Sequence, residues 1–352
     1  MSIYYLPRDY KHKHLNDAGN KARLDIEKTM DKMGYQPIGN YSTISKNRIL
    51  HFLRTITFVL GIPIYLKKGD ILIIQYPTKY YNTICRIAHL CKAYTITLIH
   101  DLGCFRQKHN SVKKEINRLN KTDALITHNL NYSNWLCQNG FIGYNKKKSP
   151  ILLHAFDFLS KANSPNRKQD WPTHKITYAG QLAIRKNRFL YDWGNLADEY
   201  NINIYGKGFD SSKAASSQKF NIKGFMHPEK LISHSEGDFG LVWDGDSVDC
   251  CRGNWGEYLK LNAPHKVSLY IRCGLPIIIW RKAAMASFIK ENGIGICIDS
   301  LHEINSIYKH LTKEDYFMMC DNISRISHLM SEGYYFNRAI SEAILCINKS
   351  IK

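Results

Sequence analysis

The sequence lacks several features that would place it in a special class. Its ten cysteines form no CxxC pair, and neither a low-complexity tract nor an internal repeat is visible. The N-terminus does not have the pattern of a signal peptide. No disulfide framework and no repeat array is therefore indicated, and a reduced, cytoplasmic protein is expected. Cys250 and Cys251 are adjacent, and we interpret them as ordinary thiols, with a reactive pair as the alternative.

The sequence also lacks a hydrophobic run long enough to span a membrane. Its most apolar segment, residues 49–66, is interrupted by His51 and Arg54, and Gly61 and Pro63 end any helix nearby. A spanning helix needs about 20 consecutive apolar residues. We therefore expect an amphipathic or buried helix in this segment, and a helix lying on a membrane surface stays open.

Acidic side chains are scarce in the first half of the chain. The 352 residues hold 49 Lys and Arg against 30 Asp and Glu, a net charge of +19, and residues 1–150 hold 24 against 9, which is +15 of that total. Such a field attracts an anionic partner, such as nucleic acid, an anionic membrane or a lipid pyrophosphate. Lysines that only solvate the surface are the alternative. Aromatic residues do not alternate with the basic runs and no nucleic-acid motif appears, so no nucleic-acid partner is expected.

Short apolar runs alternate with helical stretches along the whole chain, which is typical of βα units on a parallel sheet. A polar stretch with Ser, Asn and Pro at residues 157–173 interrupts the alternation and predicts a linker. We expect an N-terminal Rossmann-like domain over 1–156 on the acceptor side and a C-terminal one over 174–312 that binds the nucleotide. Helices over 313–352 close the chain and are open to packing back on the N-terminal domain. Two such domains would leave a cleft at the carboxyl ends of their strands.

The expected elements follow from the same patterns. The expected strands are 2–6, 70–77, 95–102, 123–129, 150–156, 175–180, 202–208, 220–225, 238–245, 275–280 and 293–299. The expected helices are one that follows a polar turn at 16–23 and ends near 33, then 49–60, 80–91, a polar helix between the strands 95–102 and 123–129, 131–139, one from about 187, 227–234, 264–273, 283–292, and two closing helices, of which the last covers 313–348 and would be broken at Gly333.

Lys266 opens an apolar helix, where the backbone dipole is already positive. A cation at this place is unfavourable unless an anion occupies the same spot, which suggests a phosphate. Ser268 lies in the same first turn. A surface lysine is the alternative for this residue taken alone.

Two further strand ends in the second half carry glycine and basic residues. Residues 178–187, YAGQLAIRKN, predict a strand, a glycine turn, and Arg185 and Lys186 entering a helix. Tyr205 ends another strand beside two glycines, where a base could stack or the backbone could approach a ligand. A solvated helix start and a plain turn are the alternatives. Together with Lys266, these strand ends predict a diphosphate site.

Three aspartates follow the expected strand at 238–245. Within the set Asp244, Asp246 and Asp249, the DGD stretch at 244–246 resembles the carboxylate pair that binds a divalent metal beside a nucleotide in one class of sugar transferases, but no further ligands stand at a recognisable spacing. A polar turn is the simpler interpretation, so no metal is expected. The residues that follow, Trp255, Tyr258 and Lys260, could line an acceptor or nucleotide pocket.

In the first half, His100 and Asp101 end a strand and would face the cleft. Asp101 is our candidate general base for an incoming hydroxyl, with His100 orienting it; a capping role for Asp101 is the alternative. His128 and Asn129 end a second strand in the same way. Near the N-terminus, Asn16 and Gly19 lie in a loop whose backbone could come close to a ligand. These six residues are the candidate site residues of the first half of the chain.

Five motifs, taken in order, resemble a known family. They are DAGNKAR (17–23), LIHD (98–101), YAGQL (178–182), GLVWDGDSV (240–248) and GEYLKLNAPHKVSLY (256–270). Together they resemble the bacterial β-1,6-galactofuranosyltransferases of O-antigen and capsule synthesis, which belong with the glucosyltransferase-3-like enzymes that glycosylate serine-rich adhesins. The resemblance runs from about residue 15 to 340 and is most specific over 240–280.

The resemblance implies a GT-B fold, in which two Rossmann-like domains with parallel sheets face an interdomain cleft. It implies that Asn16 approaches the donor and that a set of second-half residues contacts the nucleotide diphosphate. That set comprises Arg185, Asn262, Pro264, His265, Lys266, Ser268 and Leu269.

The resemblance also implies the activity and its partners. A UDP-sugar, galactofuranosyl or glucosyl, would be the donor, and an oligosaccharide or lipid-linked glycan of a surface polysaccharide would be the acceptor. An inverting, metal-independent reaction without a cofactor is expected in the cytoplasm. A peripheral contact with the inner face of an anionic membrane and a homo-oligomer stay open. A non-catalytic partner subunit is the alternative from another class.

Overall fold

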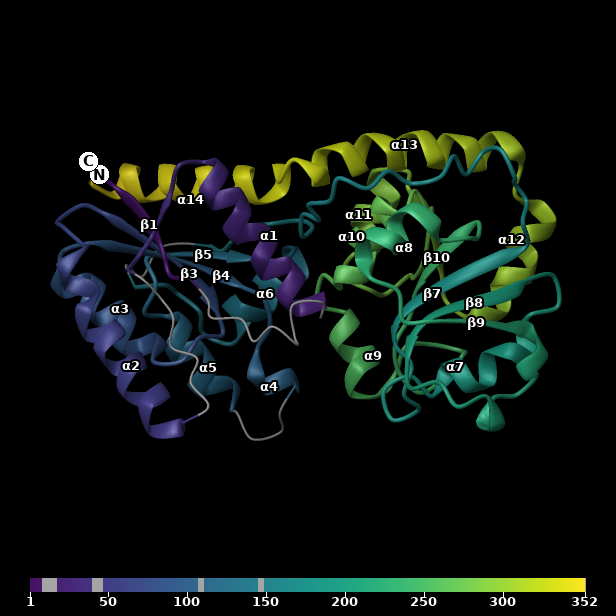
Figure 1. Ribbon diagram of the computed structural model, residues 1–352, viewed down its shortest axis with the longest axis horizontal. Coiled ribbons are helices and arrows are strands. Elements are labelled where there is room, and N and C mark those ends of the chain that lie inside the picture. Colours follow the sequence, from purple (N-terminus) through teal and green to yellow (C-terminus); the bar gives the residue numbers. More distant parts are fainter. Residues whose placement is uncertain (8–17, 40–46, 107–110, 145–148, 352) are drawn as a thin grey trace. The chain divides into compact units, whose positions relative to one another are not determined.

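The computed structural model describes residues 1–7, 18–39, 47–106, 111–144 and 149–351, and the chain forms two compact units. The first unit comprises Met1–Asp157 together with Gly333–Lys352, and the second comprises Phe158–Glu332. Figure 1 colours the chain from purple to yellow and shows that the yellow C-terminal helix belongs with the purple N-terminal elements. The chain therefore passes between the units twice.

A six-stranded parallel sheet forms the centre of the first unit, with strand order β2-β1-β3-β4-β5-β6. All six residues of β3 are buried, as expected for a parallel sheet that is covered on both faces. The strands are β1 (Ile3–Tyr5), β2 (Gln36–Pro37), β3 (Ile71–Tyr76), β4 (Tyr94–Ile99), β5 (Ala124–Thr127) and β6 (Ile151–Leu152).

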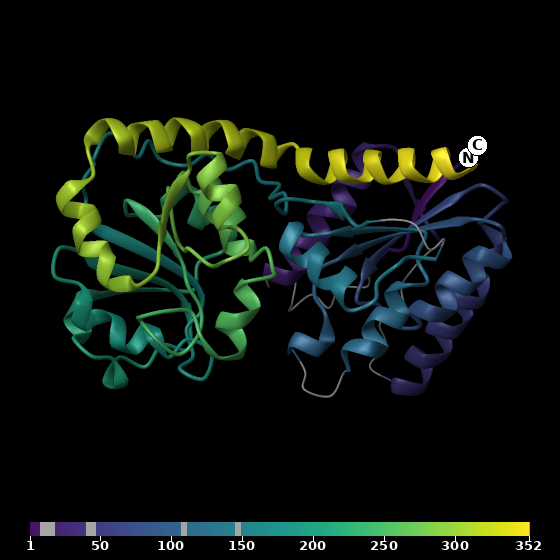
Figure 2. The same ribbon diagram turned by 180° about the vertical axis from the view of Figure 1, so that it is seen from behind.

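Helices cover both faces of this sheet. In Figures 1 and 2, α1 and α14 lie on one face, and α2, α3 and α5 lie on the other. The helices of this unit are α1 (Ala18–Lys32), α2 (Arg48–Gly61), the 3₁₀ turn η2 (Ile62–Ile64), α3 (Tyr81–Leu90), α4 (Gly103–Arg106), α5 (Val112–Leu119), α6 (Leu130–Gln138) and α14 (Tyr334–Ile351).

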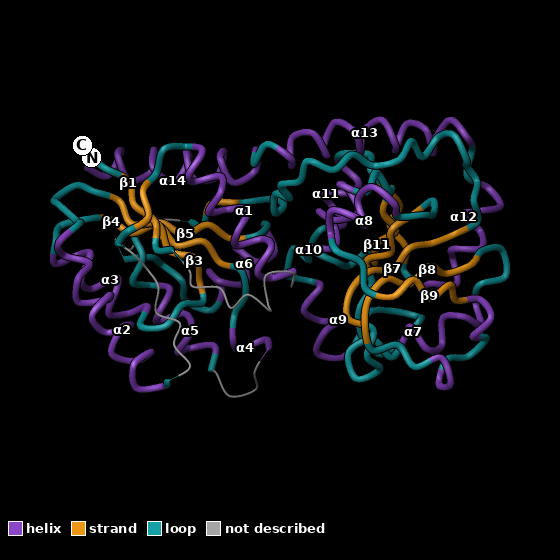
Figure 3. The backbone as a smooth tube through the Cα atoms, viewed as in Figure 1, coloured by secondary structure: helices purple, strands orange, loops and turns teal. Residues whose placement is uncertain are grey.

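The second unit repeats this plan with a second six-stranded parallel sheet, in the order β12-β11-β10-β7-β8-β9 (Figure 3). The strands are β7 (Lys175–Gln181), β8 (Asn201–Lys207), β9 (Phe220–Gly224), β10 (Phe239–Val242), β11 (Ile277–Trp280) and β12 (Gly295–Ile298). The α-helices are α7 (Phe189–Asp192), α8 (Pro228–His234), α9 (Gly253–Leu259), α10 (His265–Arg272), α11 (Ala286–Glu291), α12 (Ile304–His310) and α13 (Lys313–Ser331). The 3₁₀ turns are η3 (Trp193–Leu196), η4 (Ser211–Lys213), η5 (Ser217–Lys219) and η6 (Leu301–Glu303).

Two parallel α/β sheets confirm the fold class predicted from the alternating pattern, while several local predictions are wrong. Helix α1 begins at Ala18, inside the expected polar turn, so Gly19 is helical. Strand β2 and helix α9, which are only 2 and 7 residues long, were not predicted. The helix expected from about 187 is four residues long before it tightens into η3. Gly333, at φ +79°, separates α13 from α14.

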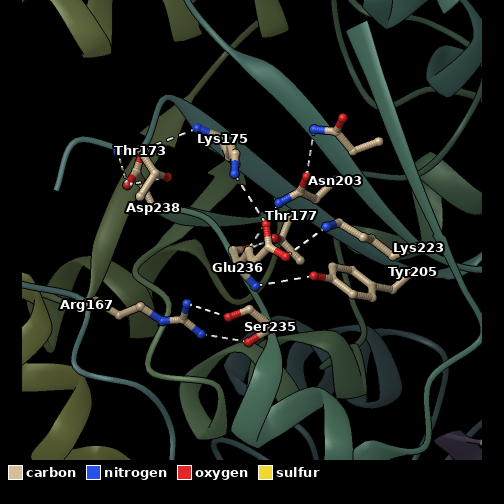
Figure 4. Close-up of polar contacts among 11 residues, drawn as sticks. Arg167, Thr173, Lys175, Thr177, Asn203, Tyr205, Lys223, Ser235, Glu236 and Asp238 are labelled. Atoms are coloured by element: carbon tan, nitrogen blue, oxygen red, sulfur yellow. Dashed lines mark hydrogen bonds and ion pairs between the residues drawn. The ribbon is translucent and has the colours of Figure 1, made fainter. Parts of the chain in front are cut away.

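The segment expected to link two domains, residues 157–173, lies almost entirely within the second unit and is anchored there by polar contacts (Figure 4). The guanidinium of Arg167 donates to the carbonyl oxygen and the hydroxyl of Ser235, each at 2.6 Å, and to the carbonyl oxygen of Cys273 at 2.7 Å. The backbone N–H and the hydroxyl of Thr173 both donate to Asp238 Oδ1 at 2.9 Å. These contacts attach both ends of the segment's second half to the second sheet and its helices.

Asp157 is the last residue of the first unit before the chain enters the second unit, and its side chain binds the start of α14. Its carboxylate accepts the backbone N–H groups of Tyr335 at 3.1 Å and Phe336 at 2.7 Å, and the residue is 4% exposed. Burial raises the pKa of Asp157 to about 7, with nearby Asp25 adding to the shift, although the two N–H donors oppose it. Asp157 therefore caps the N-terminus of α14, and its carboxyl group titrates near neutral pH.

We expect this cap to make stability fall as the pH rises. Because the folded pKa of about 7 lies above the unfolded value of 3.8, the folded state binds the extra proton between these values. Its contribution is full below about pH 4 and is lost as the pH rises through about 7, with a slope of at most about 1.4 kcal/mol per pH unit. Denaturant unfolding of the wild type and Asp157→Asn at several pH values measures this slope. An equal slope in both proteins would contradict the prediction.

Candidate functional site

The carboxyl edge of the second sheet brings two strand ends into close contact. Gly180 in β7 and Gly206 in β8 are paired, with φ of +143° and +152°, values that favour glycine. A Cβ at Gly206 would overlap the carbonyl oxygen of Gly180, and a Cβ at Gly180 would lie 3.3 Å from Cε of Lys266. The side chain of Lys266 therefore passes directly over the end of β7.

Lys266 is fixed by one partner in a strand and one in the loop that follows another strand. Its Nζ donates to the hydroxyl of Tyr178 at 2.7 Å and to Asp244 Oδ1 at 3.0 Å, and it lies 4.0 Å from the centre of the Tyr178 ring. The side chains of Lys266 and Asp244 are only 13% and 11% exposed. Tyr178 comes from β7, Asp244 lies two residues after the end of β10, and Lys266 lies in the first turn of α10, which begins after Pro264. We call these three residues the lysine cluster.

Burial and charge oppose each other in the lysine cluster. Burial lowers the pKa of Lys266 to about 8, nearby Lys186 adds to this effect, and Asp244 opposes it. Burial alone would raise the pKa of Asp244, but Lys266 and Lys186 outweigh it, so that this pKa is lowered. The pair is therefore ionised at neutral pH. A cation at the start of a helix was expected to need an anion beside it. The carboxylate of Asp244, within the same chain, is that anion.

The prediction that Arg185 and Lys186 enter a helix is wrong. Both lie in a turn after β7, in which the carbonyl oxygen of Ala183 accepts the N–H of Lys186 at 3.0 Å, and α7 begins only at Phe189. Arg185 is exposed, while Nζ of Lys186 lies 5.0 Å from the centre of the Trp255 ring of α9. The charge of Lys186 lowers the pKa of both Lys266 and Asp244, so the basic turn borders the lysine cluster. No helix begins at Arg185 or Lys186, so no helix dipole adds to the positive charge of this turn.

Tyr205 is not available for stacking on a base, which corrects that prediction. The residue is 2% exposed, and its hydroxyl accepts the backbone N–H of Glu236 at 3.2 Å (Figure 4). Tyr205 pairs with Ala179, one residue along β7 from Tyr178, so the two tyrosines point to opposite faces of the sheet. Burial also raises the pKa of Tyr205. This residue is part of the core.

The other candidates from 258–269 lie around the start of α10. Tyr258 and Ser268 are buried, Asn262 and Leu269 are half-buried, and the ring of His265 stacks on Phe158 with centres 4.9 Å apart. The buried Oδ1 of Asn262 accepts no hydrogen bond from the described residues. Lys260, at the end of α9, donates to Glu257 at 2.6 Å and lies 5.6 Å from the centre of the Trp280 ring. None of these side chains is part of the lysine cluster.

The three aspartates near residue 246 do not gather into one site. Asp244 pairs with Lys266, whereas Asp249 accepts from the hydroxyl of Ser247 at 3.1 Å and lies 3.2 Å from His302. Asp246 is exposed, and its carboxylate closely approaches Gly253 at the start of α9. Across the described part of the chain, no three His, Cys, Asp or Glu side chains are placed to hold a metal ion together.

In the first unit, Asp101 is half-buried between β4 and α4, and the histidines beside it lie in the core. His100 is 7% exposed and donates to Oε1 of Gln75 at 2.8 Å. His128 donates to the carbonyl oxygen of Ile99 at 3.0 Å, and its burial lowers its pKa to about 4. Asn129 caps α6 by accepting the N–H of Tyr132. The expectation that His128 faces a ligand is therefore wrong, because the residue is only 1% exposed, whereas the expectation for Asn129, which is half-buried, stays a prediction. Asn16 lies outside the described residues.

A buried carboxylate that was not predicted from the sequence holds the loop that follows Asp101. Glu115 is 2% exposed, and it accepts hydrogen bonds from the hydroxyl of Tyr76 and, at 2.9 Å, from the N–H of Cys104. Tyr76 ends β3 and Cys104 lies in α4, so Glu115 fixes α4 against the carboxyl edge of the first sheet. In the sequence, Glu115 looks like one charged residue of a polar helix, so only its burial shows this role.

We expect Gly206→Ala to destabilise the second unit by more than about 2 kcal/mol, because the new Cβ forces the ends of β7 and β8 apart. Gly224→Ala is the matched control, since Gly224 also has positive φ, at +71°, but nothing lies within 4 Å of a Cβ built there. Its cost should stay near the backbone penalty of about 1–2 kcal/mol. Denaturant unfolding followed by tryptophan fluorescence compares the two variants. Equal losses would show that the close contact contributes nothing.

Comparisons with known proteins agree with the two-unit organisation. The family model described as "Glucosyltransferase 3-like, N-terminal domain" matches residues 4–147, and "Glucosyltransferase 3-like, C-terminal domain" matches residues 176–343. Over 337 residues the chain is 32% identical to the beta-1,6-galactofuranosyltransferase WbbI of Escherichia coli K12, covering 93% of this chain and 94% of that one. It is 26% identical to glucosyltransferase 3 of Streptococcus gordonii over 339 residues, covering 92% and 93%.

A solved structure supports the same fold. An α,α-trehalose-phosphate synthase (UDP-forming) from Burkholderia vietnamiensis is similar with a TM-score of 0.57 at 7% identity, over 97% of this chain and 98% of that one. Two Rossmann-like units with parallel sheets and these similarities define a GT-B glycosyltransferase, as the fold prediction stated. The chain belongs to the glucosyltransferase 3-like family.

Proposed function

We propose that this glycosyltransferase moves a galactofuranosyl group from a UDP-sugar to a saccharide acceptor in the synthesis of a bacterial surface polysaccharide. The observation that carries the proposal is the lysine cluster at the carboxyl edge of the second sheet, where ligands of such sheets bind. Lys266 and the adjacent Lys186 supply positive charge there, and the paired Gly180 and Gly206 leave one pair of facing positions near the strand ends without side chains. Such a surface suits a diphosphate.

The lysine cluster suggests how a diphosphate would be received. Lys266 is already paired with Asp244, so a diphosphate has to compete with that carboxylate for the ammonium group. The hydroxyl of Tyr178 keeps a second contact to Nζ while this exchange takes place. Because a buried carboxylate without its partner is costly, the exchange also favours release of UDP after the reaction, when Asp244 pairs with Lys266 again.

The proposed reaction is a direct displacement with inversion. Asp101 removes the proton of the acceptor hydroxyl, and the oxygen attacks the anomeric carbon of the donor. The bond from that carbon to the diphosphate oxygen breaks, and UDP leaves with the bonding electrons. Lys266 and Lys186 stabilise the charge that develops on the leaving diphosphate. Since these two cations can serve in place of a divalent ion, the proposal includes no metal and no cofactor.

Two relatives named for different sugars suggest two candidate donors. The identity of 32% to a protein named as a β-1,6-galactofuranosyltransferase exceeds the 26% to a glucosyltransferase 3, and both span nearly the whole chain. This difference favours UDP-galactofuranose as the donor. Transfer of glucose from UDP-glucose to an adhesin glycan is the second candidate function, supported by the latter relative and by the family description.

A donor screen tests the proposal. The purified chain is incubated with UDP-galactofuranose, UDP-galactopyranose or UDP-glucose and with synthetic or lipid-linked glycan acceptors, and released UDP is measured with and without EDTA. We expect acceptor-dependent release from UDP-galactofuranose that EDTA leaves unchanged. Release from UDP-glucose alone would select the second candidate, and release from no UDP-sugar would contradict the enzyme function and favour a non-catalytic partner subunit.

A further inference from the structure

Helix α2 exposes a row of large apolar side chains to solvent. Ile49, Leu53 and Leu60 are 70%, 52% and 66% exposed, and Ile64 in the following turn is 81% exposed. With the half-buried Ile56, the helical members stand at positions i, i+4, i+7 and i+11, which places them on one side of the helix. We call Ile49, Leu53, Ile56, Leu60 and Ile64 the α2 stripe.

The α2 stripe is not the side by which the helix packs on its own unit. The buried residues of α2 are Thr55 and Val59, at 5% and 6% exposure, and Ile62 continues this inner side into η2 at 1%. The helix therefore has two apolar sides, one in the core and one in water. A row of exposed apolar side chains of this size usually marks an interaction surface.

The surface around the α2 stripe is strongly basic. Residues 47–122, which include α2, α3 and α5 on one face of the first sheet, hold 13 Lys and Arg and only 3 acidic residues. Two of these acids, Asp70 and Glu115, are buried, and the third, Asp101, is half-buried. This stretch of the sequence therefore contributes no fully exposed carboxylate. Exposed cations include Arg54, Lys67 and Lys68 next to the stripe in sequence, Arg86 on α3, and Lys113 and Lys114 on α5.

We propose that the α2 stripe and the basic face around it dock on the surface of an anionic lipid bilayer. An interfacial helix places its apolar side among the acyl chains and its cations at the lipid phosphates, which is the combination found here. No helix of the described residues is long and apolar enough to cross the bilayer, so the contact is peripheral.

The positive charge around the α2 stripe favours an anionic bilayer over a second copy of the chain or another protein. A second copy of the chain would bring two faces of the same sign together, which is unfavourable. A face of one sign that extends over three helices suits a broad anionic surface better than the mixed charges of a typical protein surface. Docking is separate from the donor chemistry, because the stripe lies on the helix face of the first unit and the lysine cluster lies in the second.

Vesicle co-sedimentation tests the proposal with the full chain. The wild type is mixed with phosphatidylcholine vesicles, either pure or with about one-third phosphatidylglycerol, at low and high salt. We expect binding to the anionic vesicles that weakens as salt rises, with slower hydrogen exchange of the α2 amides when bound. The double variant Leu53→Gln/Leu60→Gln should bind at least about tenfold more weakly.

Leu345→Gln is the matched control, since Leu345 is 58% exposed on α14, which covers the opposite face of the sheet. It should bind vesicles like the wild type. Because all three leucines are exposed, each variant should keep the wild-type unfolding midpoint. Absence of binding to anionic vesicles, or equal binding by the double variant, would overturn the proposal. Self-association that the double variant abolishes, or capture of an acidic protein without vesicle binding, would do the same. The donor screen, run with soluble acceptors, is unaffected by either result.

Discussion

Replacing Lys266 with methionine is expected to lower kcat/KM for the UDP-sugar by about 10²–10³-fold, because a preorganised cation is lost where charge develops on the leaving diphosphate. The same change leaves Asp244 buried without its partner, which should destabilise the second unit by about 3–5 kcal/mol. Initial-rate kinetics and denaturant unfolding on the same preparation measure the two losses.

A second variant separates the two losses. In Lys266→Met/Asp244→Asn the uncompensated charge is gone, so most of the stability should return, while activity should stay low. Lys223→Met is the matched control for activity, because Lys223 also forms an ion pair, with Glu236 at 2.7 Å, but contacts none of the lysine cluster. It should keep wild-type rates. Full recovery of activity in the double variant would show that Lys266 serves the fold alone.

Replacing Asp101 with asparagine is expected to lower kcat by about 10²–10⁴-fold, the usual loss when a general base is removed. The amide keeps the shape of the side chain but cannot accept the acceptor's proton. Affinity for UDP, measured by calorimetry, should be unchanged, because the lysine cluster belongs to the other unit. The loss should therefore appear in kcat rather than in donor binding.

Asp170→Asn serves as the control for Asp101, because it makes the same chemical change at an exposed residue of the second unit. It should leave kcat within about twofold. Turnover of Asp101→Asn within a few-fold of the wild type, with normal UDP binding, would exclude Asp101 as the base. Asp101 would then have the capping role that was the alternative in the sequence.

Parts of the site were predictable because the sequence carries them locally. Lys266 was singled out from a helix start with a cation, and the glycines of β7 and β8 were singled out from the strand ends, and the structure brings all of them together. Tyr205 and His128 were chosen from the same kind of pattern, yet both are buried in the core. A residue at a strand end points to one face or the other, and its own neighbours in the sequence do not decide which.

The sequence by itself determined the fold class, because alternating apolar strands and helices specify parallel βα units locally. It also determined the basic character of the first half and the family. Only the tertiary structure decided the partners of the charged residues. Asp244 and Lys266 are 22 residues apart and meet only because β10 and α10 pack together, and Glu115 reaches Tyr76 across 39 residues. Long-range pairing and burial depend on how whole helices and strands pack. This packing decides which charged side chains find a partner inside the chain and which, like Arg54 on α2, face the solvent.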